Sequence, residues 1–346
     1  QMLLQSIDQG EHWSELSSDL TTNDSIKIAG KGHMMYCTLT TISESPKKAG
    51  LIWVGTDDGR IQMTPDFGRN WFEFTEVLDG QGIPSNYWTT RVFASSHADS
   101  TAFVCKSGFK FDDFRPFVAR TDDMGKTWKN ISPGLPTVSV NVIVEDAVNP
   151  NLLYIGTDKG IYFSLDGGDS WQLMRGNMPA VPVRDLVIHP REQDLVAGTY
   201  GRGLYIANIH WLQQITPEVM ESEAFLFDIR PKPVSNISEA ASWGNLRLMG
   251  DNHLFTPNEE NSLYFYYWLK KPFREPPSFY IYDETNQPLD TLTGSNNAGI
   301  NELRWHTEEQ NPGTYRVVLK SGKLELFKFA GIKPAYNYPL LNWKRE

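Results

Sequence analysis

One eight-residue pattern occurs four times in this chain and limits its possible folds more than any other feature. The pattern is Ser/Thr-x-Asp-x-Gly-x-x-Trp. Its copies, called boxes 1 to 4 here, are Ser6–Trp13, Thr64–Trp71, Thr121–Trp128 and Ser164–Trp171. All four match at every fixed position, so they form a repeat. Self-similarity at a period of roughly 40 to 60 residues predicts a β-propeller or an array of repeats, not a single catalytic motif.

The fixed residues of each box suit a tight turn between two strands. The carboxylate can accept backbone N–H groups of its own turn, and the glycine permits a positive φ. The hydroxyl adds a local hydrogen bond, and the tryptophan ring packs beneath the turn. We therefore expect a structural role, and not a catalytic one, for the box residues Asp8, Trp13, Asp66, Trp71, Asp123, Trp128, Asp166 and Trp171.

The boxes resemble the Asp-box, or BNR repeat, of sialidases. Around them stand WVGTDDGRI (Trp53–Ile61), YIGTDKGIY (Tyr154–Tyr162) and VAGTYGRGLYI (Val196–Ile206). The last is similar to the final blade of bacterial secreted proteins of the sortilin-like and "glycosyl hydrolase, BNR repeat" kind. The resemblance covers about residues 2–215 and implies an all-β fold: a partial propeller of about five blades, the first incomplete. Sialidases, xyloglucanases and sortilin-type receptors all carry this repeat.

The pattern changes after residue 215, and a length of 346 residues favours two domains. We expect propeller blades over 1–215, a linker lying across the propeller over 216–250, a small β-sandwich over 251–332 and a tail over 333–346. Strands are predicted at Ser262–Lys270, Ser278–Glu284, Asn301–Thr307 and Gly313–Ser321. The sandwich resembles the immunoglobulin-like domain of flagellar hook-capping proteins.

The chain opens on the strand MLLQS, which runs directly into box 1. This arrangement predicts that the first blade is completed by an N-terminal remainder of the propeller, from the same protein or from a partner chain. The resemblance further implies a protein that is secreted, periplasmic or on the outer surface of a bacterium.

Composition excludes several classes of partner. A net charge of −10 argues against nucleic acid and anionic membranes, and no apolar run approaches the roughly 20 residues of a membrane span. The seven histidines show no metal-ligand spacing, and no nucleotide-binding motif is present, so we expect no metal and no cofactor. Cys37 and Cys105 either form one bridge or stay free.

A glycosidase needs two carboxylates that face each other across a sugar bond. The weak candidates outside the boxes are Asp112, Asp113 and Glu145. Each lies in or beside a turn, where acidic residues are favoured for turn chemistry alone. Their spacing does not bring two of them together, so the sequence leaves open whether the chain is an enzyme.

Binding residues are expected in loops, because loops on a rigid propeller carry most ligand contacts. The segment Lys106–Phe117 holds four phenylalanines, two aspartates and an arginine, and from it we select Phe114 and Arg115. From the GTYGRG turn we select Arg202 and Tyr200. In the alternative view the phenylalanines cap a blade and Arg202 ties neighbouring blades together.

These observations favour a sortilin-like binding module for an extracellular peptide, protein or glycan, forming the C-terminal part of a larger protein. The alternative is a part of a sialidase- or xyloglucanase-like glycoside hydrolase that acts on extracellular glycans.

Overall fold

The computed structural model describes residues 1–30, 36–234 and 260–335 and divides the chain into two compact units, residues 1–213 and 214–346. Each unit is described by itself. The predicted all-β class is confirmed, because antiparallel sheets make up nearly all of the regular structure. The short helices are α1 (Ser25–Gly30), η1 (Glu76–Gln81), η2 (Phe109–Phe111), α2 (His210–Gln213) and α3 (Pro217–Glu221).

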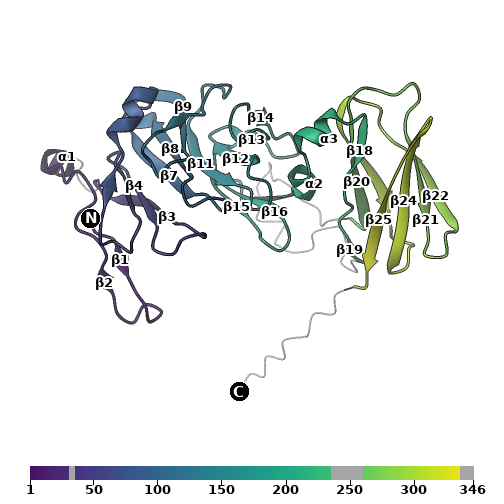
Figure 1. Cartoon of the computed structure of the whole chain (residues 1–346), viewed down its shortest axis with the longest axis horizontal. Helices are drawn as coiled ribbons and strands as arrows, with labels where there is room; N and C mark the ends of the chain where they lie inside the picture. The colour runs from purple at the N-terminus through teal and green to yellow at the C-terminus, as the bar shows by residue number, and fades with distance from the viewer. Residues whose placement is uncertain (31–35, 235–259, 336–346) are drawn as a thin grey trace, which may run out of the picture. The chain divides into compact units, whose positions relative to one another are not determined.

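The first unit is a row of sheets that follow one another in chain order (Figure 1). A two-stranded sheet, β1 (Leu4–Gln5) and β2 (Ser14–Glu15), comes first. Four larger sheets follow and are called blades B to E. Blade B is β3 (Leu39–Glu44), β4 (Ile52–Thr56), β5 (Ile61–Thr64) and β6 (Phe72–Glu73). Blade C is β7 (Trp88–Ala94), β8 (Ala102–Gly108), β9 (Asp113–Thr121) and β10 (Lys129–Asn130). Blade D is β11 (Val140–Glu145), β12 (Leu153–Thr157), β13 (Gly160–Ser164) and β14 (Gln172–Leu173). Blade E is β15 (Val183–Ile188), β16 (Asp194–Thr199) and β17 (Leu204–Asn208).

The central strands are buried on both faces, because each blade packs between its neighbours. Every residue of β4, β8, β11 and β12 is buried, so these strands do not alternate between buried and exposed positions. Trp53 of blade B packs edge-on against Trp128 of blade C, with ring centroids 5.9 Å apart. The apolar core of this unit therefore lies mainly between blades.

The first strand of each blade carries a β-bulge at one repeated position, occupied by Thr40, Thr90, Asn141 and Arg184. Three of these side chains donate to a backbone carbonyl of the next blade. The acceptors are Thr89 at 2.9 Å, Val140 at 3.2 Å and Val183 at 3.0 Å, respectively. The bulges therefore join the first strands of successive blades side by side.

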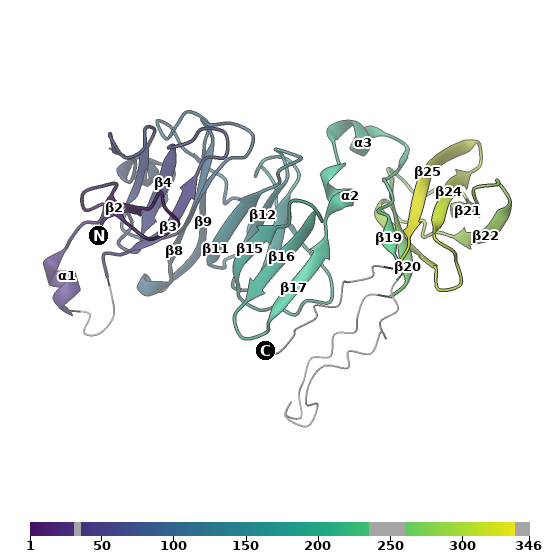
Figure 2. The same cartoon turned by 90° about the horizontal axis from the view of Figure 1, so that it is seen from below.

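The second unit consists of two sheets around one core (Figure 2). One sheet has the order β18 (Ala224–Leu226), β20 (Ser262–Leu269), β23 (Gly299–His306). The other has the order β19 (Lys232–Pro233), β25 (Leu324–Lys333), β24 (Gly313–Ser321), β21 (Ser278–Tyr282), β22 (Pro288–Thr293). Phe265 and Trp305 from the first sheet pack with Phe279 and Val317 from the second, which makes a β-sandwich. The likeness to an immunoglobulin-like domain stays a prediction.

The predicted linker over 216–250 is wrong in its described part. Residues 224–226 pair with Leu269–Tyr267 of β20, and residues 232–233 pair with β25, so both segments belong to the sheets of the second unit. The sequence analysis missed both strands, because two or three residues are too few to show an alternation of apolar and polar positions. Residues 235–250 of the predicted linker, and 336–346 of the predicted tail, lie outside the described residues.

Candidate functional site

The four boxes form turns with the same set of hydrogen bonds. In each turn the Ser/Thr hydroxyl oxygen accepts the box glycine N–H at 2.7–2.9 Å. The Asp Oδ1 accepts the backbone N–H of the residue four positions later at 2.8–2.9 Å. These bonds and their side-chain counterparts hold the pKa of each box carboxyl below its usual range. All four carboxylates are thus engaged within their own turns.

The residue four positions after each box aspartate also bonds the carboxylate through its side chain, which the sequence analysis missed. His12, Asn70, Thr127 and Ser170 contact the Asp Oδ2 at 2.5–2.6 Å. These four types share only the ability to donate a hydrogen bond. A side-chain donor at this position of every box was the sequence signal from which the contact could have been predicted.

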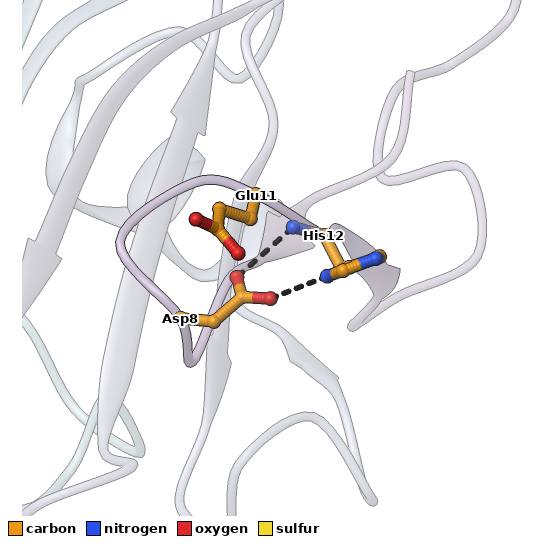
Figure 3. A group of neighbouring side chains, drawn as sticks. All are labelled: Asp8, Glu11 and His12. Atoms are coloured by element: carbon orange, nitrogen blue, oxygen red, sulfur yellow. Dashed lines mark hydrogen bonds and ion pairs between the residues drawn. The ribbon is translucent and has the colours of Figure 1, made fainter.

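In box 1 this contact gathers Asp8, Glu11 and His12 into a group with metal-ligand atoms (Figure 3). His12 Nδ1 lies 2.6 Å from Asp8 Oδ2, in the place that a hydroxyl or an amide takes in the other boxes. Glu11 and His12 are exposed. The turn geometry accounts for the group, and we do not assign a metal to it.

Two of the box tryptophans, Trp71 and Trp171, are hydrogen-bonded to the preceding sheet, whereas the buried indole N–H of Trp128 has no partner among the described residues. Trp71 donates its indole N–H to the carbonyl of Leu16 at 3.4 Å, and Trp171 donates to the carbonyl of Ile131 at 2.8 Å. Both acceptors lie three residues after the tryptophan of the preceding box. Trp13 differs: it is 62% exposed and donates to Gly10 of its own turn.

The candidate carboxylates Asp112, Asp113 and Glu145 do not form a catalytic pair. Arg115 donates to Asp113 at 2.9 and 2.7 Å, and its proximity lowers the pKa of that carboxyl to about 2. Tyr87 also donates to Asp113, at 3.0 Å. Asp112 is exposed in a left-handed conformation at the β8–β9 turn. Asp113 is therefore ionised and paired with Arg115, so it is not suited to act as a proton donor.

Glu145 lies at the other end of the blades. Its Oε2 accepts the hydroxyl of Ser95 at 2.7 Å and the N–H of Ser96 at 2.8 Å, just beyond the end of β7. Asp113 pairs with Gly108 near the start of β7. Seven residues of β7 separate these ends, about 20 Å at 3.3 Å per residue. Glycosidase carboxylates lie roughly 5–10 Å apart.

Near the start of β7, five aromatic rings form what we call the ring surface: Tyr36, Tyr87, Trp88, Phe109 and Phe111. Tyr87 stacks on Phe111, with centroids 5.1 Å apart, and Trp88 meets Phe109 edge-on at 5.9 Å. Phe109 is 45% and Phe111 51% exposed. The loop singled out from the sequence thus contributes two rings, while the loop before β7 contributes two that the sequence analysis missed.

Lys110 gives the ring surface a central cation. Its Nζ lies 5.3 Å from the ring centroid of Tyr36 and 5.4 Å from that of Trp88. The nearest acidic atom is Asp57 Oδ2 in the β4–β5 turn, at 3.9 Å. The surface therefore combines aromatic rings with the ammonium of Lys110 from blade C and the carboxylate of Asp57 from blade B.

The four predicted binding residues are split between two blades. Phe114 and Arg115 lie on β9 of blade C, and Phe114 is 50% exposed. Tyr200 and Arg202 are exposed in the β16–β17 turn of blade E, at the same end of their blade as the β8–β9 turn is of blade C. The guanidinium of Arg184 lies 5.8 Å from the ring centroid of Tyr200.

Comparisons with known proteins place the chain beside propeller proteins. No family model matches it. Over 86 residues it is 30% identical to the oligoxyloglucan-reducing end-specific xyloglucanase of Emericella nidulans, which covers 25% of this chain and 10% of that protein. YCF48 from Cyanidioschyzon merolae aligns over 49% of this chain and 52% of its own, with 22% identity and a TM-score of 0.36. The GH74 xyloglucanase from Xanthomonas campestris aligns over 93% of this chain and 50% of its own, with 12% identity and a TM-score of 0.42.

The chain thus spans a tenth of the curated relative and about half of each of these solved structures. Within residues 1–30, 36–234 and 260–335, no helix has the length and apolar character needed to span a membrane.

Proposed function

We propose that the first unit binds an extracellular glycan on the ring surface. The observation that carries this proposal is the group of rings near the start of β7: Tyr87 stacked on Phe111, Trp88 against Phe109, and Lys110 over Tyr36 and Trp88. Sugar rings present C–H groups that pack on aromatic faces, while their hydroxyls need a few polar partners. Lys110 and Asp57 supply a donor and an acceptor beside the rings. Aromatic walls with few polar groups are typical of ligand sites.

We favour a neutral polysaccharide over a peptide or a protein as the ligand. The cations beside the rings are each paired with a carboxylate: Lys110 with Asp57, Lys27 with Asp24 and Arg115 with Asp113. The ring surface therefore offers little excess charge to an ionic ligand. The 86-residue similarity to a protein named as a xyloglucanase supports a glycan of the xyloglucan type. An extracellular location follows from such a ligand and remains part of the proposal.

The same similarity favours a second function, in which the chain is part of a glycoside hydrolase. In that case its ring surface would hold the substrate while the catalytic carboxylates lie outside the described residues. The separation of Asp113 from Glu145 favours binding over hydrolysis for the described residues themselves.

The proposal is tested by calorimetric titration of the chain with xyloglucan oligosaccharides. We expect Trp88→Ala and Phe109→Ala each to weaken binding at least tenfold. Phe72→Ala is the matched control, because Phe72 is 50% exposed on the outer strand β6 and outside the ring surface. Equal losses in all three variants, or wild-type affinity in the first two, would contradict the proposal.

A further inference from the structure

Beneath the ring surface lies a lysine that no solvent reaches. Lys106 on β8 has a relative exposure of 0%, among the largest fully buried side chains of the chain. An ammonium group is rarely buried unless several acceptors compensate for the water that it loses. Neither the box turns nor the proposed ligand contacts account for it.

Three backbone carbonyls surround the ammonium of Lys106. Its Nζ donates to Gly59 at 2.8 Å, to Ser85 at 2.7 Å and to Pro84 at 3.3 Å. One ammonium has three protons, so all of its donors are used. Gly59 belongs to the β4–β5 turn of blade B, and the other two acceptors belong to the loop that leads into β7. The lysine thus ties two blades together at one point.

The two segments held by Lys106 are in close contact. Gly59 has φ +100°, and a Cβ on it would lie 2.2 Å from the carbonyl oxygen of Ser85. Carbonyl oxygens this crowded carry like partial charges, and a cation between them offsets their repulsion. Without the cation, the turn and the loop would separate or admit water.

Both segments carry the ring surface. Tyr87 and Trp88 follow Ser85 by two and three residues, and Asp57, which faces Lys110, precedes Gly59 by two. On β8 itself, Lys106 is followed directly by the turn that bears Phe109 and Phe111. Ring positions contributed by three separate segments therefore depend on a single buried group.

We propose that Lys106 is the positioning residue of the ring surface, and that glycan binding requires its protonated form. This inference rests on the proposed function. A neutral amine has two N–H donors for three carbonyls and no charge to offset their repulsion. Loss of the proton therefore frees the loop at 84–88 and disorders the rings that a sugar must contact.

The environment of Lys106 places its titration in an accessible range. Burial lowers the pKa of Lys106 to about 7, and the carboxylates of Asp79 in η1 and Asp58 in the β4–β5 turn act in the opposite direction. Asp79 also accepts the N–H of Ser85 at 2.7 Å, and Asp58 accepts the N–H of Thr22 at 2.7 Å. Although burial acts to raise it, the hydrogen bonds from Thr22 and Thr56 lower the pKa of Asp58.

The direction in which pH changes folding stability distinguishes a positioning role of Lys106 from a purely structural one. The folded pKa lies below the unfolded value of about 10.4, so between pH 7 and 10 the unfolded chain binds more protons. Lys106 therefore makes the fold more stable as pH rises through that window. Affinity for glycan should change in the opposite direction and fall. A purely structural lysine would move both quantities together.

The experiment measures the dissociation constant for a xyloglucan oligosaccharide from pH 6 to 9, with denaturant unfolding of the same samples. We expect wild-type affinity to fall at least fivefold across this range while stability does not fall. Lys106→Met should bind weakly at every pH, and Lys106→Arg, whose cation does not titrate, should bind without pH dependence. Lys129→Met removes an exposed lysine from the same blade and should behave as wild type.

Hydrogen exchange at the amides of residues 85–88 provides a readout that needs no ligand. We expect exchange there to speed up above pH 7 beyond the intrinsic rate, in the wild type alone. If no glycan binds but this exchange responds as described, the proposed function fails and the positioning role stands. A pH-independent affinity, or an unchanged exchange profile, would overturn the inference even if Lys106→Met fails to fold.

Discussion

Trp171 of box 4 donates its indole N–H to the carbonyl oxygen of Ile131, 2.8 Å away, and thereby joins blade D to the end of blade C. Ile131 follows Trp128 of box 3 by three residues, and Leu16, the acceptor of Trp71, follows Trp13 of box 1 by the same interval. Gly168 adds to the fit, since a Cβ there would lie 2.8 Å from the side chain of Ile131. The repeat thus encodes the contact between blades as well as the turn within each blade.

Trp171→Phe should destabilise the first unit by roughly 1–3 kcal/mol, because it leaves a buried carbonyl without its donor. Trp171 is 9% exposed. Trp13→Phe is the matched control: the same substitution in an exposed box tryptophan should leave the free energy of unfolding nearly unchanged. Urea denaturation measures both, and an equal cost for the two variants would argue against a role between blades.

Asp123→Ala should lower the melting temperature of the first unit by a few degrees, since it removes the acceptor of two Thr127 donors. The carboxylate lies at the surface of the turn, so the loss is smaller than for a buried acceptor. The hydrogen bond from the Thr127 hydroxyl is the largest factor that lowers the pKa of Asp123. The stabilisation that this hydrogen bond provides is present at pH values above the pKa of an unfolded aspartate, near 4. It is lost as pH falls through the folded pKa of Asp123. Melting temperatures of variant and wild type should therefore converge as pH falls below the folded pKa of Asp123, and a difference that persists in strong acid would refute this account.

The chain by itself should not hydrolyse glycosides, because Asp113 of blade C and Glu145 of blade D stand at opposite ends of the blades. Aryl-glycoside and polysaccharide panels should show no turnover. Glu145→Gln should reduce stability instead, by roughly 1–3 kcal/mol, since its buried carboxylate accepts hydrogen bonds from Ser95 and Ser96. Turnover that vanishes in Glu145→Gln or Asp113→Asn would establish the hydrolase alternative.

Cys37 and Cys105 should remain free and unreactive in the folded protein. Both are buried and unbridged, and burial raises the pKa of each thiol, which keeps the nucleophilic thiolate scarce. We expect an unchanged melting temperature with and without reducing agent, and labelling by a maleimide only after denaturation. Labelling of the native chain within minutes would show that one of these sites opens.

The face of box 1 should associate with another polypeptide segment. Ile7 is 93% and Trp13 62% exposed, whereas Trp128 and Trp171 in equivalent places are at most 9% exposed under their neighbours. We propose that a further box-type blade covers this face, from the same protein or from a partner. Light scattering of the isolated chain should show self-association that Ile7→Ser with Trp13→Ser reduces. A strictly monomeric wild type would count against the proposal.

The repeat made the propeller predictable, because every box fixes a turn, a strand on either side and a blade length. The catalytic and binding candidates were less predictable. The contacts at the ring surface form because one end of blade B lies beside one end of blade C. No pattern in the sequence predicts that Tyr36 lies beside Lys110. The sequence analysis did not select Trp88, although its ring contacts Phe109 of the loop that had been singled out.

Lys106 illustrates a second limit of the sequence. A lysine at the end of a strand ordinarily has its ammonium in solvent, and nothing in CKSGF marks this one as buried. Its partners are backbone carbonyls, which every residue possesses. Side-chain contacts with backbone carbonyls do not require a particular residue type in the partner, so they cannot be predicted from a sequence pattern and are found only in the structure.

The hydrogen bond from the fourth residue after each box aspartate has a consequence for how such repeats are recognised. Histidine, asparagine, threonine and serine all satisfy it. This position therefore holds different donor residues in the four boxes while the hydrogen-bond geometry stays the same. A sequence search that scores only residue identity misses this shared property. Scoring donor capacity there would recover degenerate copies of the repeat in chains whose aspartate or tryptophan has been replaced.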